Sequence, residues 1–347
     1  MLDFIIVGQG IAGSVLAWEL LQRGQRLWVI NNQQTNCASS AAAGIYNPIT
    51  GKAMVKTWLA DTLFPQLIRF YLKVGQTLGA SFLHPTPLFR PFLTPQERIQ
   101  WLIQSSHHDY SSLVEAVVEN TYHQERMVYQ HGGLLLRQAG YLDVPYFLSV
   151  IRDYLIAKDS YTEADFVHEA IALRTDHVRY RDIKARQVLF CEGPQAKYNP
   201  WFSTLPFRLV KGEMLSVALE EPLDVIYNRR GFVVPRTGRR AIVGATYDRD
   251  DWSLAPTRKA RQTLETQLQR TFKLPYTVQD QWAGIRPATF DRRPFIGVHP
   301  QYPQLGLFNG LGTKGVSLAP HFAQVFADHL LLQTALPQEV RLTRKLE

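Results

Sequence analysis

A glycine motif near the amino terminus is the first place where residue types and spacing indicate chemistry. Gly8, Gly10 and Gly13 complete the pattern G-x-G-x-x-G. Gly8 permits a tight turn, Gly10 leaves room for a pyrophosphate beside the backbone, and Gly13 lets a helix pack close to the preceding strand. Free N–H groups at the start of that helix favour a phosphate, and Ile11 and Ala12 within the motif are further candidate contacts. The motif therefore predicts a dinucleotide site.

A second candidate is Arg286, which lies between apolar residues and Pro287. An arginine on an exposed surface rarely has such neighbours. Two interpretations stay open, a structural buried ion pair and a bidentate contact with the carboxylate of a substrate.

The residues around the glycine motif predict the elements that hold it. Residues 4–7 are apolar and rich in β-branched side chains, which favours a buried parallel strand. Residues 14–23 fit a helix that ends before Gly24, and residues 26–30 fit the next strand. In this strand–turn–helix–strand context the motif is informative.

The end of the second strand departs from the usual dinucleotide fingerprint. An acid is expected there to accept a hydrogen bond from the ribose, whereas this chain has Asn31 followed by Asn32. An asparagine carbonyl accepts the same bond less strongly than a carboxylate. We therefore expect both asparagines to lie at the nucleotide.

Residues 39–48 are mostly small and lead into a proline. A tight loop explains them structurally. Functionally, small residues let backbone amides approach a flat ring system, and the hydroxyls of two serines can bind phosphate. The candidate cofactor contacts in this stretch are Ser39, Ser40, Ala43, Gly44 and Tyr46.

The carboxyl terminus contains a second glycine-rich turn between a strand at 306–308 and an amphipathic helix. Pro320 is expected in the first turn of that helix, where proline is tolerated. A loop with ordinary caps is the alternative to a second anion-binding helix start. The candidates in the turn are Gly310, Gly312, Thr313, Lys314, Gly315 and Val316. Two such turns at opposite ends of the chain predict one discontinuous nucleotide domain.

Composition limits the class of protein. The chain has 347 residues, 46% of them hydrophobic and 20% charged, which fits about two globular domains. Cys37 and Cys191 are expected to be small buried residues, and no spacing suits a metal. No apolar run is long enough for a membrane span, and the amino terminus lacks a basic signal region, so we expect a cytoplasmic location.

The net charge is +8, and the excess is concentrated between Arg229 and Arg261. This basic stretch contains nine lysines and arginines against Asp248, Asp250 and Asp251. A solvated, charged strand surface is one interpretation, and a face that contacts phosphates is the other.

Several stretches together resemble one known family. They are residues 8–13, Ser40–Ile45, Gly140–Pro145, Lys211–Met214, Phe232–Arg236, Val243–Thr246, Ala283–Pro287 and Gly312–Gly315. In this order, over nearly the whole chain, they resemble the D-amino-acid oxidase family of FAD enzymes, and within it glycine oxidase and the FAD domain of the tRNA-modifying enzyme MnmC. The resemblance implies noncovalently bound FAD and a second domain whose large mixed sheet roofs the flavin.

The resemblance also implies roles for single residues. Arg286 matches the arginine that holds the substrate carboxylate, and it counts among the cofactor contacts too. Phe232 stands where glycine oxidase has a substrate-contacting tyrosine, and Tyr247 falls at a pocket-lining position. Lys314, the fourth catalytic candidate with Arg286, Phe232 and Tyr247, belongs to a turn like that of MnmC, where glycine oxidase has an arginine. The remaining expected cofactor contacts are Ile171 near the adenine, and Glu192 and Gly193 after a late strand of the nucleotide domain.

The expected fold class is α/β, with a discontinuous Rossmann-type FAD domain and an α+β substrate domain built on a large mixed sheet. The FAD domain takes residues 1–80, 143–203 and 283–347, and the substrate domain takes 81–142 and 204–282. Within the latter, residues 231–235 and 240–245 are expected to pair as strands around Thr237 and Gly238.

Three functional hypotheses follow. The first is an FAD-dependent oxidoreductase that oxidises the C–N bond of an amino acid or secondary amine with a carboxylate, by hydride transfer to flavin N5. The second is a standalone relative of the MnmC oxidase that acts on carboxymethylaminomethyl-uridine in tRNA. The third is a flavin-binding protein without turnover.

Overall fold

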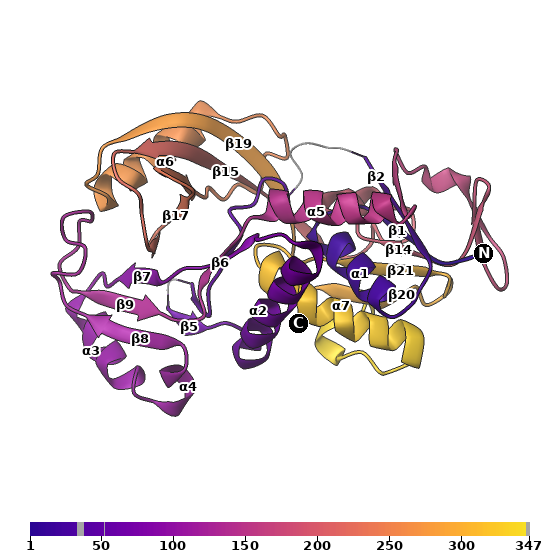
Figure 1. The fold of residues 1–347 in the computed structure, drawn as a ribbon, viewed down its shortest axis with the longest axis horizontal. Coiled ribbons are helices and arrows are strands. Elements are labelled where there is room, and N and C mark those ends of the chain that lie inside the picture. Colours follow the sequence, from indigo (N-terminus) through magenta and orange to yellow (C-terminus); the bar gives the residue numbers. More distant parts are fainter. Residues whose placement is uncertain (33–37, 52, 345–347) are drawn as a thin grey trace.

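The structure is a computed structural model that describes residues 1–32, 38–51 and 53–344. In Figure 1 the chain forms two halves side by side, with the amino terminus in the right-hand half. Cys191 is buried, as expected, with 4% of its surface exposed. Cys37 lies outside the described residues.

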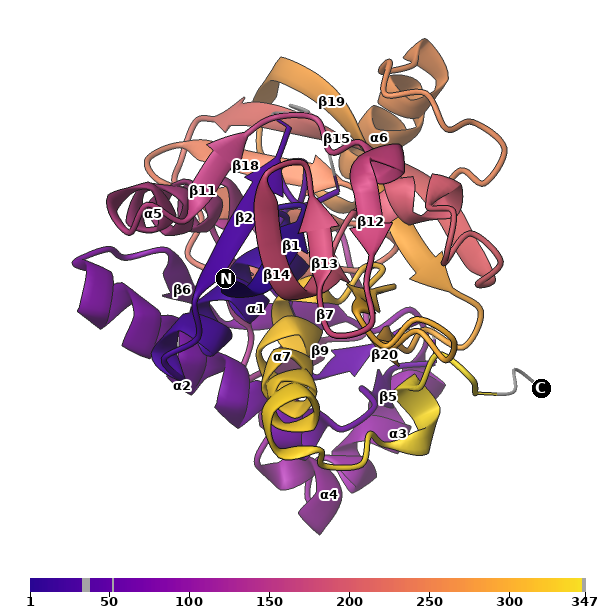
Figure 2. The same ribbon diagram turned by 90° about the vertical axis from the view of Figure 1, so that its right-hand side faces the viewer.

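The amino-terminal strand β1 lies inside a mixed sheet that we call the nucleotide sheet. β1 runs parallel to β2 and β14, and β14 also runs parallel to β21. Figure 2 shows the order β11-β2-β1-β14-β13-β12 face-on. The strands are β1 (Leu2–Val7), β2 (Leu27–Asn31), β11 (Tyr161–Glu163), β12 (Ile171–Leu173), β13 (Val178–Tyr180), β14 (Ile183–Phe190), β20 (Phe295–Val298) and β21 (Leu305–Asn309).

Alternation along β1 explains why its apolar run is continuous. Phe4 and Ile6 pack into a core with residues of the helices, whereas Ile5 and Val7 pack into a second core on the opposite face. A strand buried on both faces needs apolar residues at every position. The sequence pattern therefore predicts this element correctly.

The two helices expected from the sequence, after the first and the second glycine turn, are both present as α1 and α7. They are α1 (Ile11–Gln22), α2 (Ala60–Leu78), α3 (Pro95–Gln104), α4 (His108–Ser111), α5 (Val144–Ala157), α6 (Arg258–Thr271) and α7 (Gly315–Leu332), with 3₁₀ turns at His168–Ala170, Gly193–Tyr198 and Gln338–Val340. α1 starts three residues earlier than predicted, directly after the glycine turn, and Gly24 follows it with φ +75°.

The expectation for Pro320 is wrong, because α7 begins at Gly315 and the proline therefore lies in the second turn. A proline there has no N–H to donate to the carbonyl of Val316. The hydroxyl of Tyr71 on α2 donates to that carbonyl instead, at 3.1 Å. A residue distant in sequence thus compensates for the interruption.

The second large sheet, which we call the roof sheet, has the strand order β19-β15-β18-β17-β16-β7-β9-β8. β16 and β7 run parallel, and the other neighbours are antiparallel. Its strands are β7 (Leu88–Pro91), β8 (Val114–Val118), β9 (Gly133–Leu136), β15 (Phe207–Leu219), β16 (Ile226–Asn228), β17 (Phe232–Arg236), β18 (Arg240–Gly244) and β19 (Tyr276–Thr289). The pairing of β17 with β18 confirms the strand pair predicted around Thr237 and Gly238.

Short strands connect the two halves. β10 (Gly140–Leu142) lies between β3 (Ile45–Tyr46) and β6 (Leu83–Pro85), and β4 (Ile49–Thr50) pairs with β5 (Val55–Lys56). The proposed domain segments stay a prediction. β19 continues through residue 283, so the boundary proposed there falls inside a strand.

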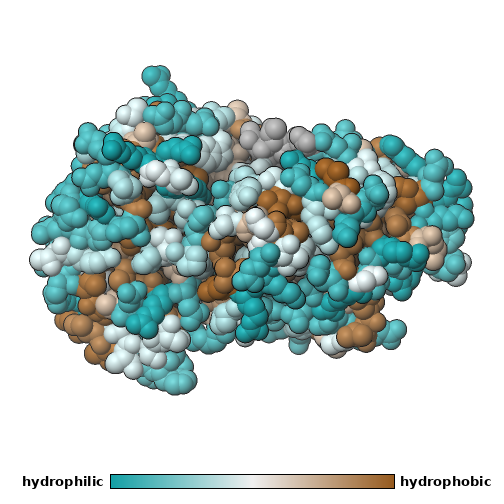
Figure 3. Space-filling view, in the orientation of Figure 1, coloured by the Kyte–Doolittle hydropathy of each residue, from teal (hydrophilic) through white to brown (hydrophobic). Residues whose placement is uncertain are grey.

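The surface is largely polar on the face seen in Figure 3, with hydrophobic side chains at the lower left edge. α3, which lies in that part of Figure 1, exposes Ile99, Leu102 and Ile103. Over the described part of the chain, no helix combines the length and apolar character that crossing a membrane requires.

Candidate functional site

A cavity of about 800 Å³ brings together residues from both large sheets. A volume of this size falls within the range of ligand-binding clefts. Most of the predicted site residues line it: Gly8, Gly10, Ile11, Ala12, Asn31, Asn32, Ser39, Ser40, Ala43, Gly44, Glu192, Gly193, Phe232, Tyr247, Arg286, Gly312, Thr313, Gly315 and Val316.

The first glycine turn has the shape that a pyrophosphate requires. A Cβ on Gly8 would lie 2.6 Å from the carbonyl oxygen of Cys191, and one on Gly10 would lie 3.1 Å from Ser39 Oγ. Ser39 Oγ also accepts from the N–H of Ile11 at 3.0 Å. α1 has no acid in its first turn and no capping side chain on Gly10, so its positive end faces the cavity without a built-in counter-charge.

The carboxyl-terminal turn meets the first one. A Cβ on Gly315 would lie 3.0 Å from Ile11 Cγ2, so the starts of α7 and α1 are in contact. α7 also has no acid in its first turn, and Lys314 provides no side-chain cap. Two helix starts with free N–H groups therefore face one cavity, which fits a dinucleotide such as FAD.

The end of the cavity beside the nucleotide sheet, which we call the nucleotide end, contains both predicted asparagines. Each of them already forms a hydrogen bond with another residue of the chain. Asn31 Oδ1 accepts from the N–H of Gln9 at 2.8 Å, and Asn32 Nδ2 donates to Asp165 at 2.9 Å. Asn31 thus fixes the glycine turn, while its oxygen keeps a second lone pair. A bond from either residue to the ribose stays a prediction.

Glu192 lines the same end within a polar cluster. Its carboxylate is 2.9 Å from His168 Nε2 and accepts from Asn199 Nδ2 at 2.8 Å. The hydrogen bond to Glu192 raises the pKa of His168 above its usual value. A hydrogen-bonded and largely buried Glu192 is held in one orientation at the cavity wall.

The opposite end of the cavity, which we call the roof end, is lined by residues of the roof sheet. There Arg286 of β19 lies over the backbone of β15. A Cβ on Gly212 would overlap the guanidinium of Arg286, so the missing side chain leaves the space that the guanidinium fills. Arg286 Nη1 donates to the carbonyl of Thr246 at 3.4 Å. Burial lowers its pKa, and no described acid forms an ion pair with it. A cation at a cavity wall without an anion can bind a carboxylate.

Phe232 and Tyr247 line the same end. A Cβ on Gly244 would lie 2.7 Å from both Phe232 Cζ and Met214 Cγ, so the phenyl ring covers Gly244 beside a methionine. Tyr247 is 59% exposed, and the guanidinium of Arg249 lies 5.5 Å from its ring. Phe232 and Met214 thus form an apolar part of the cavity wall at the end that contains Arg286.

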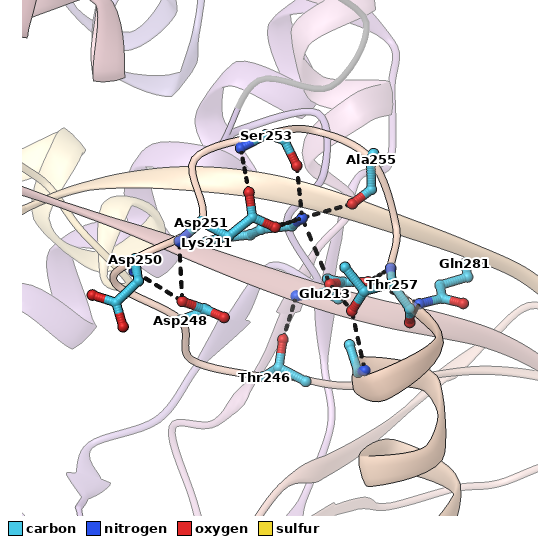
Figure 4. Close-up of polar contacts among 11 residues, drawn as sticks. Lys211, Glu213, Thr246, Asp248, Asp250, Asp251, Ser253, Ala255, Thr257 and Gln281 are labelled. Carbon is cyan, nitrogen blue, oxygen red and sulfur yellow. Dashed lines mark hydrogen bonds and ion pairs between the residues drawn. The ribbon is translucent and has the colours of Figure 1, made fainter.

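A polar network around the buried side chains of Lys211 and Glu213 holds the segment that carries Thr246 (Figure 4). Lys211 Nζ is 2.6 Å from Asp251, 3.2 Å from Ser253 Oγ and 2.6 Å from the carbonyl of Ala255. The hydrogen bond from Lys211 lowers the pKa of Asp251 to about 2. These contacts fasten residues 251–255 to β15.

Glu213 completes this network two residues along β15. Its carboxylate accepts from the N–H and hydroxyl of Thr257, at 2.7 and 2.8 Å, and from Gln281 at 2.8 Å. Its own N–H donates to Thr246 Oγ1 at 2.9 Å. Because the carbonyl of Thr246 accepts from Arg286, the network positions the guanidinium through the loop.

Five predicted residues lie outside the cavity lining: Gly13, Tyr46, Ile171, Gly310 and Lys314. A Cβ on Gly13 would overlap the carbonyl of Gly8, which agrees with a packing role. Ile171 pairs with Tyr180 in the nucleotide sheet. A contact between these five residues and the cofactor stays a prediction.

Lys314 directs its ammonium group to the hydroxyls of Thr50 and Thr57, each at 3.3 Å. Burial, together with the nearby charge of Arg292, lowers its pKa to about 8. The structure therefore places this lysine in contact with the β4–β5 hairpin, and a catalytic role for it stays a prediction.

The solvated-surface interpretation of the basic stretch is wrong for two of its arginines. Arg229 is 9% exposed and contacts Glu97 at 2.5 Å. Arg236 donates to the carbonyl of Ala43 at 2.8 Å and covers the ring of Tyr141 at 4.2 Å. Both are structural cations, because their partners lie in distant parts of the chain.

The sequence interpretation missed several lining residues, among them Gln9, Phe166, His168, Met214, Asn228 and Thr246. Gln9 stands within the glycine motif, and its amide donates to Leu148 O at 2.8 Å. Arg230 also lines the cavity, whereas the sequence analysis placed it only in the basic stretch. Proximity in the fold, which local spacing does not encode, brings these residues to the site.

Comparison with known proteins identifies a family that matches almost the whole chain. The family described as DAO, FAD dependent oxidoreductase, matches residues 3–329. The bifunctional protein ThiO/ThiG of Synechocystis sp. is 28% identical over 96% of this chain and 52% of its own length. The tRNA 5-methylaminomethyl-2-thiouridine biosynthesis bifunctional protein MnmC of Marinobacter nauticus is 25% identical over 99% of this chain and 57% of its own length. The chain spans about half the length of these relatives.

A solved structure supports the fold. The glycine oxidase from Geobacillus kaustophilus superimposes with a TM-score of 0.82 at 20% identity, covering 100% of this chain and 99% of that chain. The expected α/β fold with a Rossmann-type domain and a large mixed sheet is thereby confirmed.

Proposed function

Since the chain belongs to the DAO family of FAD-dependent oxidoreductases, we propose that it oxidises the C–N bond of an amino acid or secondary amine that carries a carboxylate. Bound FAD supplies the acceptor for the hydride that leaves the α-carbon. The product is an imine, which water then hydrolyses. The observation that carries the proposal is Arg286, a cation at the cavity wall that forms no ion pair with the described residues.

The residues of the chain supply placement. Arg286 binds the carboxylate and fixes one end of the substrate, which turns an encounter into a reactive geometry. Phe232 and Met214 provide an apolar wall that excludes water from the reacting carbon. The N–H groups at the start of α7 stabilise negative charge that develops beside them. No base from the chain is required when the amine arrives neutral.

The experiment is anaerobic bleaching of the yellow protein by sarcosine, with dimethylamine as the matched amine without a carboxylate. Arg286→Ala should raise KM for sarcosine about 100-fold, as expected for loss of a charged, bidentate contact. Arg69→Gln, which removes an exposed charge on α2 outside the lining, is the control. Unchanged kinetics in Arg286→Ala would dismiss the role of the arginine. If no amine or amino acid in a broad panel bleaches the flavin, the protein is a flavin binder without turnover.

We also infer a second candidate, the oxidation of a carboxymethylaminomethyl group on tRNA, from the exposed cations of the basic stretch. Arg239, Arg240, Arg258 and Lys259 are exposed and form no ion pair with the described residues, which suits contacts to phosphates. The affinity for tRNA should fall steeply between 50 and 200 mM salt. It should also be lower in the double variant Arg258→Gln/Lys259→Gln than in the wild type. No salt-sensitive binding at low ionic strength would remove this candidate.

A further inference from the structure

The roof end of the cavity has an unusual charge balance. Among the lining residues of segments 212–247 and 284–287, the charged ones are Arg286 and Arg230, and no acid accompanies them. One carboxylate neutralises one of these cations. The second cation therefore has no role in the oxidation of an amine that carries a single carboxylate.

Arg230 is held at this end by its neighbours. It lies in the three-residue loop between β16 and β17, where Asn228 pairs with Phe232. The residue before it, Arg229, is buried and forms an ion pair with Glu97. A Cβ on the residue after it, Gly231, would lie 3.1 Å from the carbonyl oxygen of Gly244, so the backbone of the loop lies close to β18. Arg230 itself has φ +58°, is exposed, and forms no hydrogen bond or ion pair with the described residues.

Strand register places the two arginines at the same level of the roof sheet. Met214, Gly244 and Phe232 lie side by side on β15, β18 and β17. β15 and β17 both run antiparallel to β18, so the loop before Phe232 lies level with the residues before Met214. The guanidinium of Arg286 covers one of these, Gly212. The separation is two strand spacings, roughly 10 Å, and two long side chains can reach across it.

We propose that Arg230 forms a second anion subsite and that the preferred substrates are small amines with two oxyanionic groups, one on Arg286 and one on Arg230. This inference rests on the proposed function for the identity of the reacting amine. A guanidinium binds either a carboxylate or a phosphate in a bidentate manner, and a dicarboxylic amine is the smallest molecule that meets both cations. Thr246 and Tyr247 line the space between the two.

The test measures the binding of two ligands that the enzyme cannot oxidise, so its result does not depend on turnover. Thiodiacetate and methylthioacetate have the same thioether and differ by one carboxylate, and neither has a C–N bond to oxidise. Their dissociation constants are measured on the FAD-loaded protein from the change in flavin absorption. Thiodiacetate should bind about fivefold more tightly than methylthioacetate, as expected for a partly exposed ion pair, and the difference should shrink at high salt.

Arg230→Gln should weaken thiodiacetate binding about fivefold and leave methylthioacetate binding within a factor of two. Arg69→Gln, with the same loss of charge on α2, should change neither. Equal affinity of the two ligands for the wild type, or an equal loss for both in Arg230→Gln, overturns the proposal. Loss of tRNA binding in Arg230→Gln without loss of thiodiacetate binding also overturns it. Failure of every amine to bleach the flavin would overturn the oxidase function and leave these binding constants interpretable.

Discussion

Gly212→Ala tests how the roof sheet positions the substrate arginine. The backbone of Gly212 is not in the left-handed region, so alanine adds no conformational strain there. Its Cβ, however, falls inside the guanidinium of Arg286. The guanidinium must move by an ångström or more to reach ordinary contact distance. A misplacement of about 1 Å at a reacting centre costs up to about 100-fold in rate.

We therefore expect Gly212→Ala to lower kcat/KM for sarcosine by about 10- to 100-fold while the affinity for FAD stays unchanged. The assay is anaerobic flavin reduction, with FAD affinity measured separately by fluorescence. In an Arg286→Ala background, the same substitution should cost less than twofold, because the group that it displaces is gone. Unchanged kinetics in Gly212→Ala, or additive effects in the double variant, would refute the reasoning.

Two other substitutions test buried cations. Lys314→Met should raise the free energy of unfolding at pH 7 by about 1–2 kcal/mol, as measured by chemical denaturation. The drop of the lysine pKa from 10.5 to about 8 means that burying the charged ammonium group costs at most about 3 kcal/mol of stability. Since the folded-state pKa is depressed, the whole cost of burying the charge applies below pH 8, and this cost decreases as the pH rises towards 10.5. If the stability gained by Lys314→Met stays constant from pH 8 to pH 10.5, the burial argument is contradicted. Lys211→Met should lower the free energy of unfolding by about 3 kcal/mol, because it breaks a buried ion pair, and should raise KM through the loop that carries Thr246. A variant with wild-type stability and KM would show that the network in Figure 4 positions nothing.

The elements around both glycine turns could be predicted from the sequence, because local patterns determine them. Residues 4–7 are apolar at every position, and the glycine spacing predicts the turn and a helix after it, although α1 begins at Ile11 inside the motif and not after it. The strand pair at β17 and β18 also follows from local turn chemistry. Pro320 was misplaced because the compensating hydroxyl of Tyr71 comes from α2, more than two hundred residues away.

The small-residue loop at 41–43 shows what local patterns do not contain. Trp282 donates to the carbonyl of Ala41 at 3.0 Å, and Arg236 donates to that of Ala43 at 2.8 Å. Both donors come from strands of the roof sheet, so the loop connects the two large sheets. Arg236 counts in the sequence as part of a basic surface, and tertiary contacts make it a structural residue. The position of Arg286 also depends on a tertiary contact, because its guanidinium fills the space that the absent side chain of Gly212 leaves.

Titration of FAD into the apoprotein is the most direct test of the shared cofactor site. The account predicts one FAD per chain in the wild type, with binding lost both in Gly10→Val, which blocks the approach to the first turn, and in Gly315→Val, which adds bulk where α7 meets Ile11. Circular dichroism and the melting temperature must show that each variant remains folded. Wild-type affinity in either folded variant would contradict the convergence of the two turns on one FAD.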